Sequence, residues 1–211
     1  ITIPDSVTNM GDYVFYACSS LKSAVIGHGL NNIGVWTFYS CSGLTSITIP
    51  DSVTEIGEGA FSYCESLTSI TIPDGVTSIG RGVFDGCEQL PPILFSTGEK
   101  ILLLYSSQNV ATEYSIPNTV TYIASSAFGN CSNLTSITIP ANVTSIGSYA
   151  FENCSSLVSM TIPNKVTAIE DYTFKGCSSL TGITIPNSVI RIGEGVFHSC
   201  SSLVSITIPN G

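Results

Sequence analysis

One 23-residue phrase recurs along most of this chain of 211 residues. The stretch LTSITIPDSVTEIGEGAFSYC, which begins at Leu44, returns almost unchanged at Leu134 as LTSITIPANVTSIGSYAFENC. The cysteines measure the period, because each follows the last after one 23-residue unit, except at a single gap that holds a 23-residue and a 21-residue unit. Near-identical units of this length fold into near-identical coils, and these stack in one dimension, each coil touching its neighbours.

The pattern within one unit predicts a short strand followed by turns. Apolar and polar residues alternate in Ser46-Ile47-Thr48-Ile49, which is typical of a strand with one buried face. Pro50 ends that strand because it has no N–H to donate. The residues predicted to face inward in this coil are Leu44, Ile47, Ile49, Val53, Ile56, Phe61 and Cys64.

The period and the L-x-x-I-x-I core together predict a right-handed leucine-rich repeat solenoid, of α/β or mostly β class. We expect a curved parallel sheet of about ten short strands spaced by about 4.8 Å, with short helical or irregular turns on the opposite side. The predicted strands end at Ile3, Ile26, Ile49, Ile72, Phe95, Ile116, Ile139, Ile162, Ile185 and Ile208. A buried aromatic spine is predicted from Phe15, Phe38, Phe61, Phe84, Phe128, Phe151, Phe174 and Phe197.

The middle of the chain departs from the repeat. A 21-residue unit at about 93–116 lacks the Ala-Phe and Cys positions, and Ile101–Tyr105 within it predicts a hairpin-like insertion with its own strand. The unit is interpreted either as a variant coil or as a binding edge or junction. We otherwise predict a single array over 1–211. Because it begins and ends in mid-phrase, we expect a fragment of a longer protein.

Charge and hydropathy exclude several classes of partner. The formal net charge is −9 and only six residues are Lys or Arg, so nucleic acids and anionic membranes are disfavoured. The longest apolar run is too short for a transmembrane helix, so no direct membrane insertion is predicted.

The residues give no pattern for catalysis, cofactors or metals. The two histidines, His28 and His198, are predicted to lie about 35 Å apart along the stack, because seven coils separate them at the strand spacing. No C-x2-C pair and no calcium-binding loop is present. We therefore predict a non-enzyme with no catalytic, cofactor or metal site.

The eight cysteines are predicted to be a structural ladder of reduced, inward thiols. Equivalent Cβ atoms in stacked coils lie about 4.8 Å apart or more, whereas a disulfide needs about 3.8 Å. A buried free cysteine behaves as a small hydrophobic residue. The ladder consists of Cys18, Cys41, Cys64, Cys87, Cys131, Cys154, Cys177 and Cys200.

Function is expected at the outward positions. Ser and Thr in the strands either suit an exposed sheet or form a weakly charged docking surface, and aromatic residues at variable positions are common interface anchors. Val25, Leu94 and Ser115 interrupt the threonine row. The candidate binding surface consists of Ser46, Thr48, Ser69, Thr71, Ser136, Thr138, Ser159, Thr161, Thr184, Ser205, Thr207, Trp36, Tyr39, Tyr63, Tyr149 and Tyr172.

The consensus L-x-x-I-x-IP-x-x-V-x-x-IG-x-x-AF-x-x-C resembles the BspA-like leucine-rich repeat family, also called the Treponema pallidum type. The resemblance covers essentially the whole chain, including the irregular unit. It implies a cell-surface or secreted protein that acts in adhesion and binds a host protein, such as fibronectin or fibrinogen, or a glycan. The alternative is a structural spacer that displays other domains.

Overall fold

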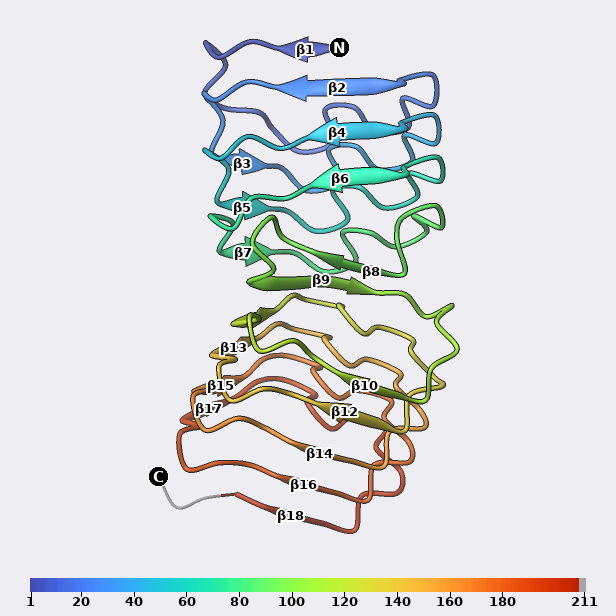
Figure 1. Cartoon of the computed structure of the whole chain (residues 1–211), viewed down its shortest axis with the longest axis vertical. Coiled ribbons are helices and arrows are strands. Elements are labelled where there is room, and N and C mark those ends of the chain that lie inside the picture. Colours follow the sequence, from blue (N-terminus) through green and yellow to red (C-terminus); the bar gives the residue numbers. More distant parts are fainter. Residues whose placement is uncertain (209–211) are drawn as a thin grey trace. The chain divides into compact units, whose positions relative to one another are not determined.

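The computed structural model describes residues 1–208, and within them the regular secondary structure is all strand (Figure 1). The chain divides into two compact units, Ile1–Gly98 and Glu99–Gly211, and each is described here by itself. Both are stacks of coils joined by parallel strands, which confirms the predicted leucine-rich repeat solenoid and places it in the mostly β class. All ten predicted strand rows are present.

In the first unit, two rows of strands run along the stack (Figure 1). The first row is a parallel sheet of β1 (Thr2–Ile3), β2 (Ser23–Ile26), β4 (Ser46–Thr48) and β6 (Ser69–Thr71), and β8 (Ile93–Phe95) is not part of that sheet. The second row contains β3 (Asn32–Ile33), β5 (Glu55–Ile56) and β7 (Ser78–Ile79). Paired residues are one repeat apart, as in Ser23, Ser46 and Ser69, so equivalent residues of successive repeats are adjacent.

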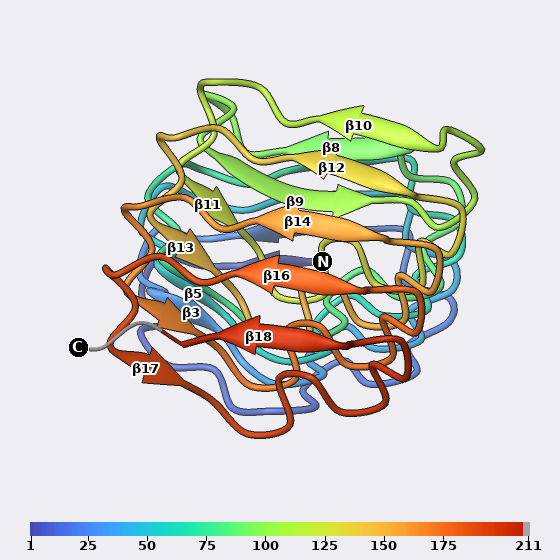
Figure 2. The same cartoon turned by 90° about the horizontal axis from the view of Figure 1, so that it is seen from below.

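The second unit repeats this plan, and Figure 2 shows its two rows on different sides of the coils. The first row is β10 (Glu113–Ser115), β12 (Ser136–Thr138), β14 (Ser159–Thr161), β16 (Gly182–Thr184) and β18 (Ser205–Thr207). The second row contains β9 (Ile101–Tyr105), β11 (Tyr122–Ile123) and β13 (Ser145–Ile146), and a separate pair, β15 (Ala168–Ile169) and β17 (Arg191–Ile192).

The inward residues predicted for one coil are all buried. Leu44, Val53, Phe61 and Cys64 have no exposed surface, and Ile47, the most exposed of the seven, shows 4%. The phenylalanines stack between coils with ring centroids 5.1 to 6.1 Å apart in the first unit and 5.1 to 5.8 Å in the second. Burial of each such side chain contributes about 1.5 to 3 kcal/mol, so the core of every coil is stabilised mainly by its neighbours.

The turn that carries the Ala-Phe pair is irregular, so the helical alternative is excluded for the described coils. Alternate N–H groups of one turn donate to carbonyls of the next coil, as Tyr13, Phe15 and Ala17 do over 2.8 to 2.9 Å. This ladder needs positive φ at two positions per turn, for example 61° at Tyr13 and 56° at Ala17. The turn forms the third side of each coil, beside the two rows of strands. It is therefore also joined to the next coil by backbone hydrogen bonds.

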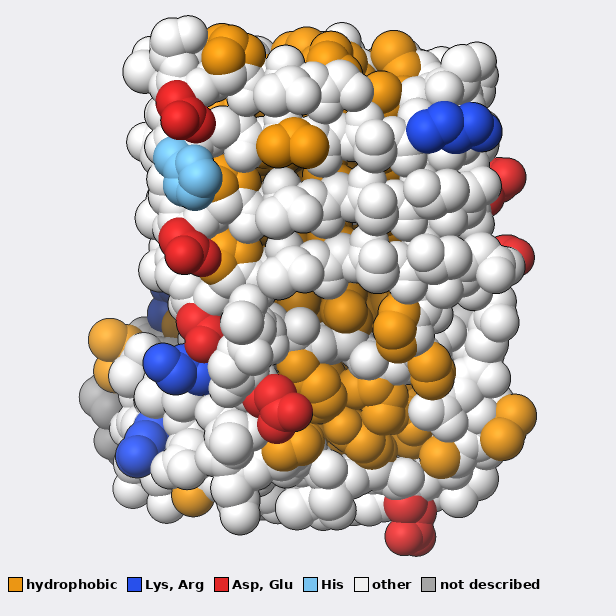
Figure 3. Space-filling model, turned by 45° about the horizontal axis from the view of Figure 1, so that its top comes forward, with side chains coloured by type: hydrophobic (Ala, Val, Ile, Leu, Met, Phe, Trp, Pro, Cys, Tyr) orange, Lys and Arg blue, Asp and Glu red, His pale blue; other side chains and the backbone are white. Residues whose placement is uncertain are grey.

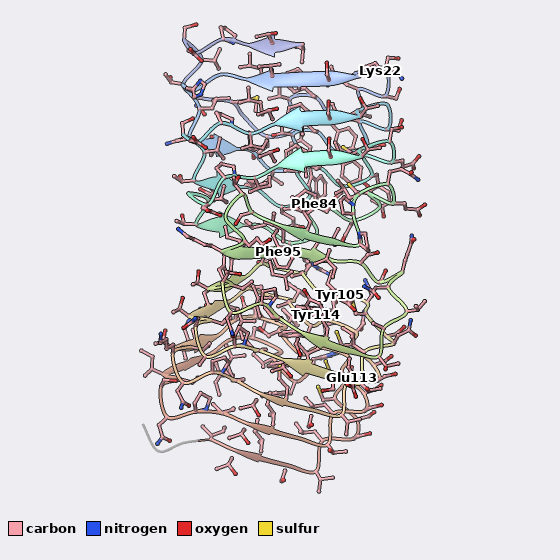
Figure 4. The ribbon with its side chains drawn as sticks, viewed as in Figure 1. Lys22, Phe84, Phe95, Tyr105, Glu113 and Tyr114 are labelled. Atoms are coloured by element: carbon pink, nitrogen blue, oxygen red, sulfur yellow. The ribbon has the colours of Figure 1, made fainter. Side chains whose placement is uncertain are left out.

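The irregular unit keeps more of the repeat than its sequence indicates. Its predicted strand is present as β9, and β9 pairs in parallel with β11, so it takes the second-row position of its coil. The prediction that the aromatic position is missing was wrong, because Tyr105 stacks on Phe128 at 5.2 Å. Tyr105 also lies beside Tyr114, with ring centroids 4.6 Å apart (Figure 4). The single array and the hairpin-like insertion stay predictions.

Candidate binding surfaces

In the second unit, the outward face of the sheet formed by the first row of strands carries mainly serine and threonine hydroxyl groups. β12 and β14 each place one buried residue between two exposed ones, as in Ser159-Met160-Thr161. Because the register equals one repeat, the outward side chains form two rows across four strands. These rows are Ser136, Ser159, Gly182 and Ser205, and Thr138, Thr161, Thr184 and Thr207.

This face is hollowed. A depression of about 550 Å³ runs over β12, β14, β16 and β18 and is lined by both hydroxyl rows. No charged side chain is among the residues that line it. The seven predicted surface residues of the second unit's strands therefore lie together around one shallow, uncharged groove.

The first unit carries the remaining predicted Ser and Thr positions on β4 and β6, namely Ser46, Thr48, Ser69 and Thr71, all exposed. Figure 3 shows this part of the surface as mostly polar and uncharged, with scattered hydrophobic side chains. Val25 interrupts the row as expected, since it is 54% exposed. Leu94 was expected to face outward, but it is buried at 8% exposure, so the outward row does not continue through β8.

A cluster of five aromatic rings lies on the turn side of the first unit. Trp36 meets Tyr13 edge to face at 5.3 Å and contacts Tyr39 at 5.6 Å. Tyr39 stacks on Tyr16 at 5.0 Å and meets Tyr63 at 5.4 Å. We call Tyr13, Tyr16, Trp36, Tyr39 and Tyr63 the aromatic cluster. Partial burial, together with Tyr16 and Tyr63, raises the pKa of Tyr39.

A small recess adjoins the aromatic cluster. It has a volume of about 170 Å³, and its aromatic walls are Trp36, Tyr39 and Tyr63. Charged side chains complete the lining: Glu58, Arg81 and Asp85, all exposed. Trp36, Tyr39 and Tyr63 were predicted as surface residues, and the structure brings these three together.

Glycines of the next coil hold two of these rings in place. A Cβ at Gly59 would lie 2.4 Å from the Trp36 ring, and one at Gly86 would lie 2.7 Å from the Tyr63 ring. Real Cβ contacts are not this short, so glycine is required for the rings to lie flat against the next coil. This pairing was missed from the sequence, although its signal is there: an aromatic residue followed one repeat later by glycine.

The other two predicted aromatics, Tyr149 and Tyr172, belong to the second unit. They stack on each other at 5.0 Å, and the Tyr172 hydroxyl donates to the Glu194 carboxylate, which raises the pKa of Tyr172. Lys175 lies 5.7 Å from the centre of the Tyr172 ring and pairs with Glu152 at 2.8 Å. Tyr172 therefore already contacts charged groups of the chain itself.

The cysteines line the inside of the turn, and six of the eight are buried; Cys18 is exposed and Cys200 is half-buried. Each thiol from Cys41 onward donates to a carbonyl of the previous coil, as Cys87 does to Phe61 over 3.0 Å and Cys177 to Phe151 over 3.2 Å. The position therefore selects a small residue that also donates a hydrogen bond, which the sequence reasoning missed. Burial raises the pKa of Cys87, Cys131 and Cys177 to about 12.

The described residues offer no candidate for two other kinds of site. Residues 1–208 contain no group of three or more His, Cys, Asp or Glu side chains placed to hold a metal ion. Over the same residues, no helix is long and apolar enough to span a bilayer.

The repeat identifies the family. The model of the BspA type leucine rich repeat region, present in six copies, matches residues 1–105 and 103–211. The chain belongs to the BspA-type leucine-rich repeat family. No curated protein matches the chain significantly.

Three crystal structures are similar to this BspA-type chain over nearly its whole length. A leucine rich cell surface protein from Faecalibacterium prausnitzii is 30% identical, with a TM-score of 0.51, and the match covers 100% of this chain and 79% of that one. The pneumococcal vaccine antigen PcpA is 23% identical with a TM-score of 0.64, over 100% and 62%. A leucine-rich repeat protein from Eubacterium ventriosum is 23% identical with a TM-score of 0.52, over 99% and 80%. The last two likenesses concern the fold alone.

Family membership gives a coarse function. Leucine-rich repeat arrays of this kind are typically non-catalytic, and they generally mediate protein interactions. The chain is accordingly a protein-interaction repeat module, of a type found in bacterial surface proteins.

Proposed function

We propose that this chain is a non-catalytic adhesion module of a cell-surface or secreted protein, and that it binds a host extracellular-matrix or cell-surface protein. The observation that carries the proposal is the uncharged groove of about 550 Å³ along β12, β14, β16 and β18. Fibronectin and fibrinogen are the first partners to test.

The chemistry of the groove supports a protein partner. Its rows of Ser and Thr hydroxyls both donate and accept hydrogen bonds, so they suit main-chain amides of an opposing protein. Short side chains lose little conformational entropy when they are fixed in an interface. An uncharged surface also avoids the desolvation of ions that makes charged interfaces costly.

The test is direct binding of the purified chain to immobilised fibronectin and fibrinogen, followed by substitution in the groove. Thr161→Lys in β14 places a long charged side chain in the middle of the groove and should weaken binding at least about tenfold. Ser145→Lys in β13 is the matched control, since Ser145 is also an exposed strand residue of the second unit but lies in the other row.

Two outcomes would contradict the proposal. If the chain binds neither fibronectin nor fibrinogen at micromolar concentration, the result favours the alternative that the chain is a structural spacer. Equal loss of binding in both lysine variants would show that added charge acts from anywhere on the unit, and the groove would then not be the site.

A further inference from the structure

The aromatic cluster of the first unit points to a second site of different chemistry. Three of its five rings are about half exposed, with Tyr13 at 50%, Tyr16 at 46% and Tyr63 at 47%. Exposed tyrosine and tryptophan gathered into one contiguous patch are typical of interaction surfaces. Scattered single aromatics would need no such explanation.

The backbone under the recess is left-handed at two of its aromatic residues. Trp36 and Tyr63 have φ values of 52° and 58°, in the left-handed region that disfavours side chains. At the equivalent places the following coils use glycine, as at Gly59 for Trp36 and at Gly86 for Tyr63, whereas the preceding coils use Tyr13 and Ser40. The left-handed conformation is common to the turns, and what distinguishes these two positions is a large aromatic ring beside a glycine of the next coil.

The rings of the recess pack on the next coil. The Trp36 ring lies against Gly59 and the Tyr63 ring against Gly86, each in the space that a Cβ of that glycine would need. Tyr39 fills the space between them, within 5.6 Å of each ring centre. A rigid site loses less entropy on binding than a mobile one.

Charge decides which partner suits this site. The first unit carries nine Asp and Glu residues against two Lys and Arg, a formal charge of −7 of the chain's −9. Two carboxylates, Glu58 and Asp85, line the recess and outnumber its one cation, Arg81. Aromatic faces attract cations through their quadrupoles, and carboxylates pair with the same groups.

We infer that the recess with the aromatic walls Trp36, Tyr39 and Tyr63, whose charged lining of Glu58, Arg81 and Asp85 is negative in sum, binds an arginine or lysine side chain in a basic segment of a partner protein. Its volume of about 170 Å³ suits one such side chain, not a folded surface. This site goes beyond the proposed adhesion groove, because it lies in the other unit and recognises positive charge. Either site binds its partner without the other.

The probe is a short fluorescent peptide of alternating arginine and glycine, tested against the same peptide with citrulline in place of arginine. Trp36 is the single tryptophan of the chain, so its fluorescence reports on the recess directly. We expect the arginine peptide to bind and to change that fluorescence. The citrulline peptide should bind about two- to fivefold more weakly, because citrulline removes the cation that an exposed aromatic face attracts.

Two variants locate the site. Trp36→Gly installs the residue that the next coils carry at this position, and polarisation of the labelled peptide should show at least about a tenfold loss of affinity. Ser126→Gly is its control, because Ser126 has the equivalent left-handed conformation in the second unit, with φ at 58°. Glu58→Gln should also weaken binding, whereas Glu55→Gln, which removes the same charge from the exposed face of β5, should change it less than about twofold.

Circular dichroism would check that each variant folds, and Tyr63→Gly replaces Trp36→Gly if the latter does not. Equal affinity for the arginine and citrulline peptides would overturn the inference. So would unchanged affinity in the folded Trp36 or Tyr63 variant. A change in Trp36 fluorescence with neutral oligosaccharides but not with the arginine peptide would assign the recess to glycans instead.

Discussion

The buried thiols should make the fold sensitive to alkaline pH. Burial raises the pKa of Cys87, Cys131 and Cys177 from 9.0 to about 12. In the unfolded chain the same thiols ionise near pH 9, so the folded state binds more protons between pH 9 and pH 12. The stability that these thiols contribute is therefore complete below pH 9 and is lost as the pH rises through that window.

The magnitude follows from the width of the window. At pH 10 each of the three thiols lowers the free energy of unfolding by about 1 to 2 kcal/mol relative to neutral pH. Together the three thiols lower the free energy of unfolding by about 4 kcal/mol. A typical domain is stabilised by only about 5 to 15 kcal/mol, so this loss is large. Urea titrations at pH 7, 9 and 10, followed by circular dichroism, would measure this loss.

The control separates the thiols from other groups that ionise at high pH, such as the nine tyrosines. A Cys87, Cys131 and Cys177 triple alanine variant should be less stable at pH 7, yet should lose about 4 kcal/mol less than the parent between pH 7 and pH 10. If the triple variant is too unstable, Cys131→Ala alone should remove about a third of the effect. An unchanged alkaline loss in these variants would refute the reasoning.

Three further predictions follow from single contacts. Tyr105→Phe should raise the free energy of unfolding by about 1 kcal/mol in a urea titration, because the buried Tyr105 hydroxyl has no hydrogen-bond partner within residues 1–208. A loss of stability would show that the hydroxyl has a partner. Gly59→Ala should shift the fluorescence of Trp36, since the new Cβ would meet the indole ring; an unchanged spectrum would mean that the ring is not packed there. Alkylation of the native chain should modify Cys18 quickly and the six buried cysteines only after denaturation, when mass spectrometry should count eight labels; fewer labels without reductant would reveal disulfides.

The repeat made most of the fold predictable. Alternation in Ser46-Ile47-Thr48-Ile49 fixes which side chains are buried, and a register of one repeat then brings equivalent positions of every coil together. The aromatic spine follows from the same register. These features depend on side-chain periodicity, which a single sequence carries in full.

The parts that were missed depend on backbone conformation. Nothing in the sequence of the Ala-Phe turn indicates that two residues, four apart, adopt positive φ, because alanine, serine, tyrosine, asparagine and tryptophan all occur at these positions as well as glycine. The thiol bond to the preceding coil was hidden for a similar reason, since its acceptor is a main-chain carbonyl 26 residues earlier. Tyr105 was overlooked because the consensus asked for phenylalanine, although tyrosine fills the same place.

The same turns explain how an array of nearly identical coils can carry specific sites. The strands and the buried face are constrained by contacts with both neighbours, so their residues hardly vary. The left-handed positions of the turn point outward and accept glycine at least cost. A large residue at such a position lies against the coil beyond, where either a glycine makes room for it, as Gly59 does for Trp36, or a second ring packs on it, as Tyr172 does on Tyr149. The aromatic cluster therefore depends on pairs of coils, where an aromatic residue in one lies against a glycine in the next.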